Sequence, residues 1–307
     1  MQSGYHRYSA GVSGTGGGQQ SKPAEGIPRR TRHSFKIWAQ ETDWDTLRRV
    51  WVAADRDGFW DVVWLNDHLY PPKSSPQVAM MEAWSLLGGL AAMTERIRFG
   101  TMVSSNTFRH PAILAKQATT LDNMSDGRIE IGLGAGWHEG EHRAYGISLP
   151  PLSERFDRLE ETLIVLEGLF TQEVFSFAGR YQTISEAYFE PKPVQRPRPP
   201  FVIGGAGPRR TIPLAARWAD QWNYPDYDGD TGLLEKSFSI FHDSLAECGR
   251  SSTDVEISVQ FRYPNDLVRM REQVDGYLAA GANHILVSFS PGSDPALVPK
   301  VAAALAV

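Results

Sequence analysis

An acid and a histidine stand side by side directly after an apolar stretch of the chain. The run FWDVVWLN, residues 59–66, has the apolar density of a buried strand, and Asp67 and His68 follow it. An imidazole in such a place is suited to proton transfer near neutral pH, and the neighbouring carboxylate is suited to orienting a group or accepting a hydrogen bond from a ligand. The alternative is a histidine that only bonds a loop carbonyl.

A second candidate lies where an alternating strand runs into small residues. Residues 128–141 read RIEIGLGAGWHEGE, and large apolar side chains occupy every second position up to Leu133. Residues 134–136 then remove side-chain bulk, and Trp137 follows them. Bare backbone at the end of a strand suits the close approach of a flat ring or a phosphate. A tight turn without a ligand is the alternative.

The tract GGAGPRR, residues 204–210, has the features of an anion site. It follows an apolar strand, places Pro208 early in a helix and sets Arg209 and Arg210 beside the free N–H groups of the helix start. The spacing matches neither the dinucleotide fingerprint nor the P-loop. A packed turn with solvated arginines is the alternative.

Other chemistries lack the residues they need. His110, His138 and His142 match no standard ligand spacing, so no metal site is predicted. No serine-centred nucleophile motif is present, and Cys248 is predicted in the last turn of a helix, so covalent hydrolysis has no candidate nucleophile. As the single cysteine, Cys248 also favours a reducing compartment.

The composition argues for a cytoplasmic protein that acts on small molecules. The 307 residues include 31 basic and 36 acidic side chains, a net charge of −5, without a long basic run, which speaks against nucleic acid or an anionic membrane as partner. No apolar run reaches the roughly 18 residues of a membrane span. Residues 1–33 are rich in Gly, Ser and Gln and are predicted to be a disordered tail.

The remaining chain, 34–307, alternates strand and helix patterns. Eight apolar runs with strand periodicity are each followed by a helical pattern, which predicts a (β/α)8 TIM barrel of class α/β rather than an open doubly wound sheet. The irregular segment 174–200, between the fourth and fifth strands, is predicted to be an insertion. An open sheet remains the alternative.

A barrel would bring the candidate residues together, because all strands of such a barrel end on one face. The residues expected around one pocket are Gln40, Asp67, His68, 104–106, 134–137, 204–207 and Tyr224.

Several long segments resemble the luciferase-like monooxygenase superfamily, in the branch that uses the deazaflavin coenzyme F420. They are GFWDVVWLNDHL (58–69), RIRFGTMVSSNTFRHPAILAKQATTLDNMSDGRIEIGLGAGWHEGEHRAYGI (96–147), ERFDRLEETL (154–163) and PKPVQRPRPPFVIGGAGPRRTIPLAARWADQWN (191–223). The resemblance extends from about Phe35 to the end of the chain. It implies a TIM barrel, hydride transfer, a cofactor at the C-terminal face of the strands and a homodimer.

The resemblance also assigns roles to residues. His68 matches the proton-transfer histidine and Asp67 an acid that contacts the ring system. GTMVSSNTFR, 100–109, matches the strand with a non-prolyl cis peptide, here between Met102 and Val103. The other matched positions around the cofactor are Ser105, Asn106, Ala135, Gly136, Trp137 and Gly140, with Gly204, Gly205, Ala206 and Gly207 as the phosphate-binding turn and Arg209 or Arg210 for the acidic tail.

One position departs from the pattern. Trp137 stands where some deazaflavin dehydrogenases have a glutamate acid, which argues against a sugar-phosphate dehydrogenase and favours stacking or an apolar substrate pocket, with Trp38, Trp64 and Trp222 as further candidates. Three functions follow in order of preference: an F420-dependent oxidoreductase, a flavin mononucleotide (FMN) monooxygenase, and a non-catalytic cofactor-binding barrel.

Overall fold

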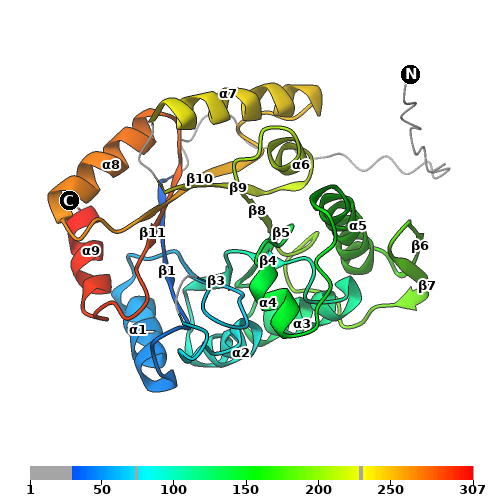
Figure 1. The fold of residues 1–307 in the computed structure, drawn as a ribbon, viewed down its shortest axis with the longest axis horizontal. Helices are drawn as coiled ribbons and strands as arrows, with labels where there is room; N and C mark the ends of the chain where they lie inside the picture. The colour runs from blue at the N-terminus through cyan, green and yellow to red at the C-terminus, as the bar shows by residue number, and fades with distance from the viewer. Residues whose placement is uncertain (1–29, 73–74, 228–230, 307) are drawn as a thin grey trace. The chain divides into compact units, whose positions relative to one another are not determined.

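The computed structural model describes residues 30–72, 75–227 and 231–306. Within this part of the chain, eight parallel strands close into a barrel, because β3 pairs with β5 as well as with β2. Figure 1 shows the helices arranged around these strands. The predicted (β/α)8 barrel is therefore confirmed, and the open sheet is excluded.

The strands and helices alternate along the chain. The barrel strands are β1 (Arg32–Ile37), β2 (Val62–Leu65), β3 (Arg98–Thr101), β5 (Ile129–Gly134), β8 (Phe201–Gly204), β9 (Gln221–Asp226), β10 (Glu256–Arg262) and β11 (His284–Ser288). The helices that follow them are α1 (Trp44–Asp57), α2 (Ala83–Met93), α3 (Pro111–Met124), α5 (Leu152–Thr171), α6 (Thr211–Trp218), α7 (Thr231–Glu247), α8 (Leu267–Ala279) and α9 (Leu297–Leu305). The short β4 (Ser104–Ser105) and α4 (Glu139–Ala144) follow β3 and β5.

A hairpin stands apart from the barrel sheet. Strands β6 (Val174–Ala178) and β7 (Thr183–Tyr188) form their own antiparallel sheet between the fourth and fifth barrel strands, inside the segment predicted as an insertion. Figure 1 shows it beside α5. Gly168 of α5 lets the hairpin approach, since a Cβ there would lie 2.0 Å from the ring of Phe175.

The first strand begins earlier than the composition predicts. Residues 1–29 of the predicted tail lie outside the described residues, but Arg32 and His33 already belong to β1 and pair with His284 and Ile285 of β11. The Arg32 side chain also forms salt bridges inside the barrel, which a composition-based prediction does not detect.

Two apolar clusters hold the barrel together. The larger one lies between the strands and the surrounding helices. The smaller one fills the barrel interior and contains Val62, Trp64, Met102, Val202 and Leu286. Among the described residues, no helix is both long enough and apolar enough to cross a membrane.

A charged cluster closes the end of the barrel where the strands begin. The buried Glu130 accepts hydrogen bonds from Arg32 at 2.7 Å and from Arg98 at 2.6 Å, and Arg32 also binds Glu256 at 2.7 Å. Burial alone raises the pKa of the Glu130 carboxyl, but the two arginines outweigh burial and lower the pKa to about 2. Glu130 therefore stays ionised inside the barrel.

This cluster predicts a loss of stability in acid. The pKa of Glu130 is below its ordinary value of 4.5. Its ionised carboxylate therefore contributes fully to the free energy of unfolding above pH 4.5, and this contribution is lost as the pH falls towards 2. The shift corresponds to about 3 kcal/mol in the free energy of unfolding. Urea unfolding at a series of pH values measures it: Glu130→Gln should be less stable at pH 7 and lose this part of the pH dependence.

The matched control is Glu154→Gln, which removes a partly exposed carboxylate that is paired with Arg158 on α5. It is expected to change the free energy of unfolding by no more than about 1 kcal/mol. If the two variants had the same pH dependence, the assignment to Glu130 would be wrong.

Candidate active site

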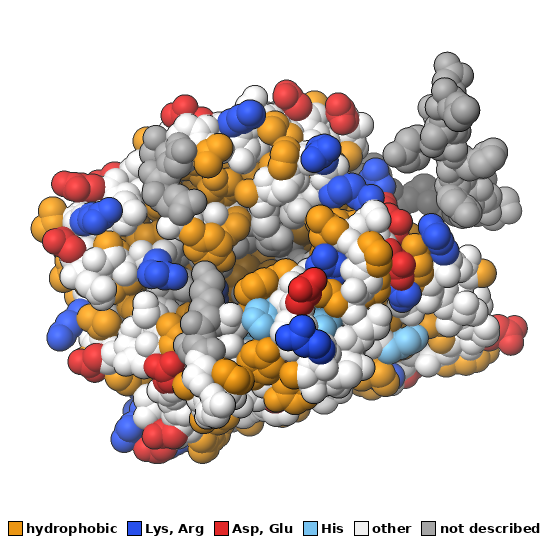
Figure 2. Space-filling model, in the orientation of Figure 1, with side chains coloured by type: hydrophobic (Ala, Val, Ile, Leu, Met, Phe, Trp, Pro, Cys, Tyr) orange, Lys and Arg blue, Asp and Glu red, His pale blue; other side chains and the backbone are white. Residues whose placement is uncertain are grey.

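A cavity of about 620 Å³ lies at the C-terminal ends of the strands. All eight barrel strands, or the residues directly after them, contribute to its lining. Figure 2 shows this face hollowed near its centre, with a histidine at the edge of the hollow. TIM-barrel enzymes carry their active sites at this position.

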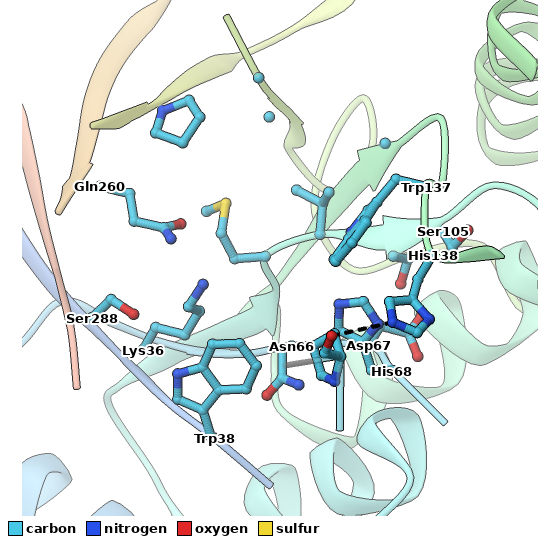
Figure 3. Close-up of a pocket in the computed structure, with 18 of the residues that line it drawn as sticks. Lys36, Trp38, Asn66, Asp67, His68, Ser105, Trp137, His138, Gln260 and Ser288 are labelled. Carbon is cyan, nitrogen blue, oxygen red and sulfur yellow. Dashed lines mark hydrogen bonds between the residues drawn. The ribbon is translucent and has the colours of Figure 1, made fainter. Parts of the chain in front are cut away.

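His68 and Glu141 form a hydrogen-bonded pair in the cavity wall, where Figure 3 shows His68 close to Trp137 and His138. Nδ1 of His68 lies 3.2 Å from each carboxylate oxygen of Glu141, whose side chain is 1% exposed. An ionised carboxylate only accepts hydrogen bonds, so Nδ1 carries the hydrogen and Nε2 is the nitrogen left for proton exchange. The pair has the geometry of a general acid or base held by an orienting carboxylate.

Backbone donors keep Glu141 ionised. The N–H groups of Leu69 and Tyr70 donate to its Oε2 at 2.6 and 3.4 Å. Burial alone raises the pKa of the Glu141 carboxyl, but the hydrogen bonds from His68 and from these two N–H groups outweigh burial and hold the pKa below its usual range. The same carboxylate thus orients the imidazole of His68 and fixes the two residues that follow it.

Two further histidines position α4. Nδ1 of His138 accepts from the N–H of Glu141 at 2.9 Å, so its Nε2 carries the hydrogen and donates to the carbonyl of Pro72 at 3.2 Å. Nδ1 of His142 donates to the His138 carbonyl at 2.8 Å, and its Nε2 lies 2.6 Å from Thr107 Oγ1. These residues, considered above as metal ligands, instead join α4 to the loops after β2 and β3.

Asp67 is held by an arginine. Both of its oxygens are bonded by Arg109, at 2.5 and 3.2 Å, and its side chain is 1% exposed. Arg109 also binds Glu82 at 2.5 Å, at the start of α2. The bidentate contact fixes the orientation of the carboxylate at the cavity and neutralises its charge.

The cavity floor contains the cis peptide bond between Met102 and Val103 that the resemblance implied. The adjacent glycines make room for the Val103 side chain: a Cβ on Gly134 would lie 2.6 Å from it, and a Cβ on Gly204 would lie 3.0 Å from it. These two glycines were predicted to admit a ligand, and the structure gives them this packing reason in addition. Substituting either one would displace Val103.

Gly136 serves a different purpose. Its φ of 80° is in the left-handed region, and a Cβ there would lie 2.4 Å from Ser105 Oγ. Ser105 Oγ in turn lies 2.6 Å from Thr107 Oγ1, and Arg155 of α5 donates to the Gly136 carbonyl. The turn after β5 is therefore held in place by Ser105 of β4 and by Arg155 of α5.

The turn after β8 has the features of an anion cradle. Gly205 has a φ of 126°, its N–H donates to the carbonyl of Asn223, and its own carbonyl accepts from Trp222 Nε1 at 2.9 Å. A Cβ on Gly207 would lie 2.8 Å from the Thr211 hydroxyl at the start of α6. Bare backbone beside a helix N-terminus is the arrangement that binds phosphate.

Two buried amides lack hydrogen-bond partners within the described part of the chain. Both side-chain atoms of Asn66, which lines the cavity, and of Asn106, which follows β4, are unpartnered. A buried amide without partners costs about 1–3 kcal/mol for each unsatisfied group. Because Asn66 lines the cavity, its side chain is positioned to bond a ligand.

The structure brings most of the predicted site residues to one cavity. Those that line it are Asp67, His68, Met102, Val103, Ser105, Gly136, Trp137, Gly204 and Gly205. Asn106, Ala135, Gly140, Ala206 and Gly207 do not. Ala135 and Ala206 pack against the core, and Gly140 lies in α4, where a Cβ would meet the Tyr70 hydroxyl at 2.5 Å.

Some of the aromatic residues predicted for the pocket line it, and others lie elsewhere. Trp38 lines the cavity, and Trp137 lies at its mouth, 57% exposed, with its ring centroid 5.7 Å from that of His68. Trp64 and Trp222 are fully buried and do not line the cavity, which agrees with core packing, the alternative to a place in the pocket for these two residues. The expected place of Tyr224 in the pocket is wrong: its ring packs against Phe238 outside the barrel, because alternate residues of β9 face opposite sides.

Sequence reasoning missed Glu141 and the polar side chains Lys36, Gln260 and Ser288, all of which line the cavity. The sequence contains a signal for Lys36, since it is a charged residue between the apolar Phe35 and Ile37 of β1. The sequence contains no such signal for Glu141, because its position opposite His68 depends on how α4 packs.

A comparison of the sequence with known protein families agrees with this geometry. The sequence profile of the luciferase-like monooxygenases matches residues 26–264, most of the chain. The chain belongs to this family. The family resemblance expected from the sequence segments is confirmed.

Two relatives carry different cofactors in their names. An F420-dependent glucose-6-phosphate dehydrogenase of Microbacterium testaceum is 32% identical over 232 residues, which are 75% of this chain and 67% of the relative. An FMNH2-dependent dimethylsulfone monooxygenase of Pseudomonas putida is 33% identical over 196 residues, which are 63% of this chain and 52% of the relative.

Solved structures share the fold. An F420-dependent secondary alcohol dehydrogenase in complex with an F420–acetone adduct superposes with a TM-score of 0.78 at 20% identity, covering 89% of this chain and 97% of that one. The long-chain alkane monooxygenase LadA has a TM-score of 0.66 at 16% identity, covering 83% of this chain and 70% of that one.

Proposed function

We propose that this family member is an oxidoreductase that transfers a hydride between coenzyme F420 and a small organic substrate. The observation that carries the proposal is the His68–Glu141 pair in a cavity that also contains a glycine cradle after β8. Relatives and fold neighbours named as F420-dependent support the choice of cofactor.

The residues present fit a large, flat, anionic cofactor. The unpartnered Asn66 amide in the cavity wall offers hydrogen bonds to a polar ring edge, and the bare backbone of Gly207 beside the start of α6 suits a phosphate. Arg209 is available for an acidic tail, whereas Arg210 is paired with Asp157 at 2.5 Å.

When bound, F420 accepts or donates the hydride at C5 of its ring; the protein supplies position, exclusion of water and the proton. Nε2 of His68 is placed to hold or take the proton, while Glu141 orients the imidazole by accepting a hydrogen bond from Nδ1. Arg109 fixes Asp67 as a hydrogen-bond acceptor beside His68. Trp137 covers the mouth and limits access of water.

We do not propose glucose 6-phosphate, the substrate in the names of the dehydrogenase relatives, as the substrate of this protein. Trp137 occupies the position where the sequence pattern of some of those enzymes has an acid, and its indole contributes apolar surface to the pocket. A homodimer in the cytoplasm stays a prediction from the resemblance and the composition.

An FMN-dependent monooxygenase is the second candidate, because the Pseudomonas putida relative has about the same sequence identity to this chain as the Microbacterium testaceum relative, although over a shorter part of it. A non-catalytic cofactor-binding barrel is the third, and any cofactor-dependent turnover would exclude it.

Side-by-side binding titrations test the proposal. The purified protein should bind F420 with a dissociation constant of about 10 μM or lower and FMN at least about tenfold more weakly. Fluorescence of each cofactor measures the binding. Tight binding of FMN with none of F420 would favour the monooxygenase.

Gly207→Val tests the cradle. A side chain there meets the Thr211 hydroxyl and fills the turn, so the affinity for F420 should fall about tenfold or more. Gly276→Ala is the control, since a Cβ there meets nothing within 4 Å in α8. Equal affinities in the two variants would remove the cradle from the binding site.

A further inference from the structure

Three polar side chains occupy one level of the barrel rim, on the adjacent strands β1, β11 and β10. The strand register pairs Lys36 with Ser288, and Ser288 with Arg262. All three line the cavity, so they face its interior. Gln260, two residues before Arg262 on the same strand, lines the cavity one level deeper. We call Lys36, Ser288, Arg262 and Gln260 the polar rung.

The lysine of this rung is deeply placed. Lys36 is 5% exposed, and its Nζ lies 5.2 Å from the centroid of the Trp38 ring. Taking an ammonium group out of water is costly, and charged side chains with this degree of burial in a cleft are concentrated at functional sites. Figure 3 shows Lys36 extending into the cavity beside Trp38, together with Gln260 and Ser288.

An unpartnered amide lies in the same cavity. Asn66 is 3% exposed, and neither its Oδ1 nor its Nδ2 has a hydrogen-bond partner within the described residues. It follows β2, the neighbour of β1, which places it between the polar rung and His68 along the cavity wall. Its amide can donate a hydrogen bond to a ligand that reaches the rung.

The charges of the cavity are unevenly distributed. Its described carboxylates are Asp67 and Glu141, and each is already bonded, to Arg109 and to His68. Both belong to the wall formed by the loop after β2 and by α4. The cations Lys36 and Arg262 belong to the part of the wall formed by β1, β11 and β10. An anion bound there would be attracted by two positive charges and would not face an uncompensated carboxylate.

We propose that the polar rung binds a carboxylate group of the substrate and so restricts the enzyme to anionic substrates. This assignment rests on the proposed function, in which the same cavity holds both cofactor and substrate. The Lys36 ammonium, the Arg262 guanidinium and the Ser288 hydroxyl are donors at one level, which suits the two oxygens of a planar carboxylate. The carboxylate anchors one end of the substrate, and the reacting carbon lies towards His68.

The test compares two ligands of similar shape and different charge. The protein loaded with F420 is titrated with benzoate and with benzamide, and ligand-observed NMR measures each dissociation constant. Wild-type protein should bind benzoate at least about tenfold more tightly than benzamide. Lys36→Met should weaken benzoate about 10- to 100-fold and leave benzamide within about threefold. Lys36→Arg, which keeps the charge, should retain most of the preference for benzoate.

Each other outcome overturns the assignment. Unchanged binding of benzoate to Lys36→Met would show that the rung does not hold the anion. Equal weakening of benzoate and benzamide would show a structural role for Lys36 and not recognition of charge. A loss of F420 affinity in Lys36→Met, measured in the preceding titration, would move Lys36 to the cofactor.

The experiment distinguishes a failure of the proposed function, which is the absence of F420 binding, from a failure of the polar rung to bind the carboxylate. If wild-type protein does not bind F420, the same comparison is made on protein without cofactor, with Arg209→Met as the control for an anion at the turn after β8. Loss of benzoate binding in Lys36→Met alone would then support the rung. Loss of benzoate binding in Arg209→Met alone would overturn the assignment of the carboxylate to the polar rung.

Discussion

Replacing His68 with alanine is expected to lower turnover by about 10² to 10⁴-fold, the usual contribution of a general acid or base. The imidazole is the titratable cavity group that is oriented by a buried carboxylate, through the contacts of Nδ1 with Glu141. The measurement is F420-dependent turnover of any substrate that the wild type converts, followed by the deazaflavin absorbance. The dissociation constant of F420 should stay within about threefold, because the loss belongs to the reaction step.

Glu141→Gln separates orientation from charge. Glutamine keeps the length of the side chain and can still bond Nδ1 of His68, but it removes the negative charge beside the imidazole, so turnover should fall less than in His68→Ala. His242→Ala is the matched control, because His242 lies on the exposed surface of α7. If His68→Ala retained wild-type turnover, proton transfer would have to be assigned to another group.

Arg109→Met is expected to lower the free energy of unfolding by about 3–5 kcal/mol, because it leaves a buried carboxylate without its partner. Asp67 is 1% exposed, and Arg109 bonds both of its oxygens. Urea unfolding at pH 7 measures the effect. The double variant Arg109→Met, Asp67→Asn should recover most of the loss, since it removes the unpaired charge as well.

An exposed pair supplies the comparison. Arg48 and Asp45 form a salt bridge of 2.6 Å on α1, with side chains 43% and 54% exposed. Arg48→Met should therefore cost no more than about 1 kcal/mol. A similar loss in Arg48→Met and Arg109→Met would mean that burial of Asp67 does not determine the energy.

The fold was predictable because its signals are local. Several barrel strands are short apolar runs, such as VVWL of β2 and FVIG of β8, and helices with an apolar face follow them. Parallel strands buried on both sides need this composition, and the alternation then leaves few topologies. The start of β1 was not predicted, because Arg32 is held by carboxylates that lie 98 and 224 residues further along the chain.

The candidate site was predictable in part for the same reason. Asp67 and His68 follow a strand directly, so the barrel alone carries them to the rim. The orienting carboxylate was not predictable, because Glu141 is 73 residues away from His68 and reaches it only through the packing of α4. The glycines after β5 and β8 were correctly placed, but their contact with Val103 required the coordinates.

The sequence by itself determined the strands, the helices and the residues that end each strand, because apolar periodicity and glycine positions act over a few residues. The tertiary structure decided which of those residues share a hydrogen bond and which side chains line the cavity. Glu141 lies beside His68 because α4 packs against the loop after β2, and Lys36 lies beside Ser288 because β1 pairs with β11; in both cases segments far apart in the sequence become neighbours only in the folded barrel.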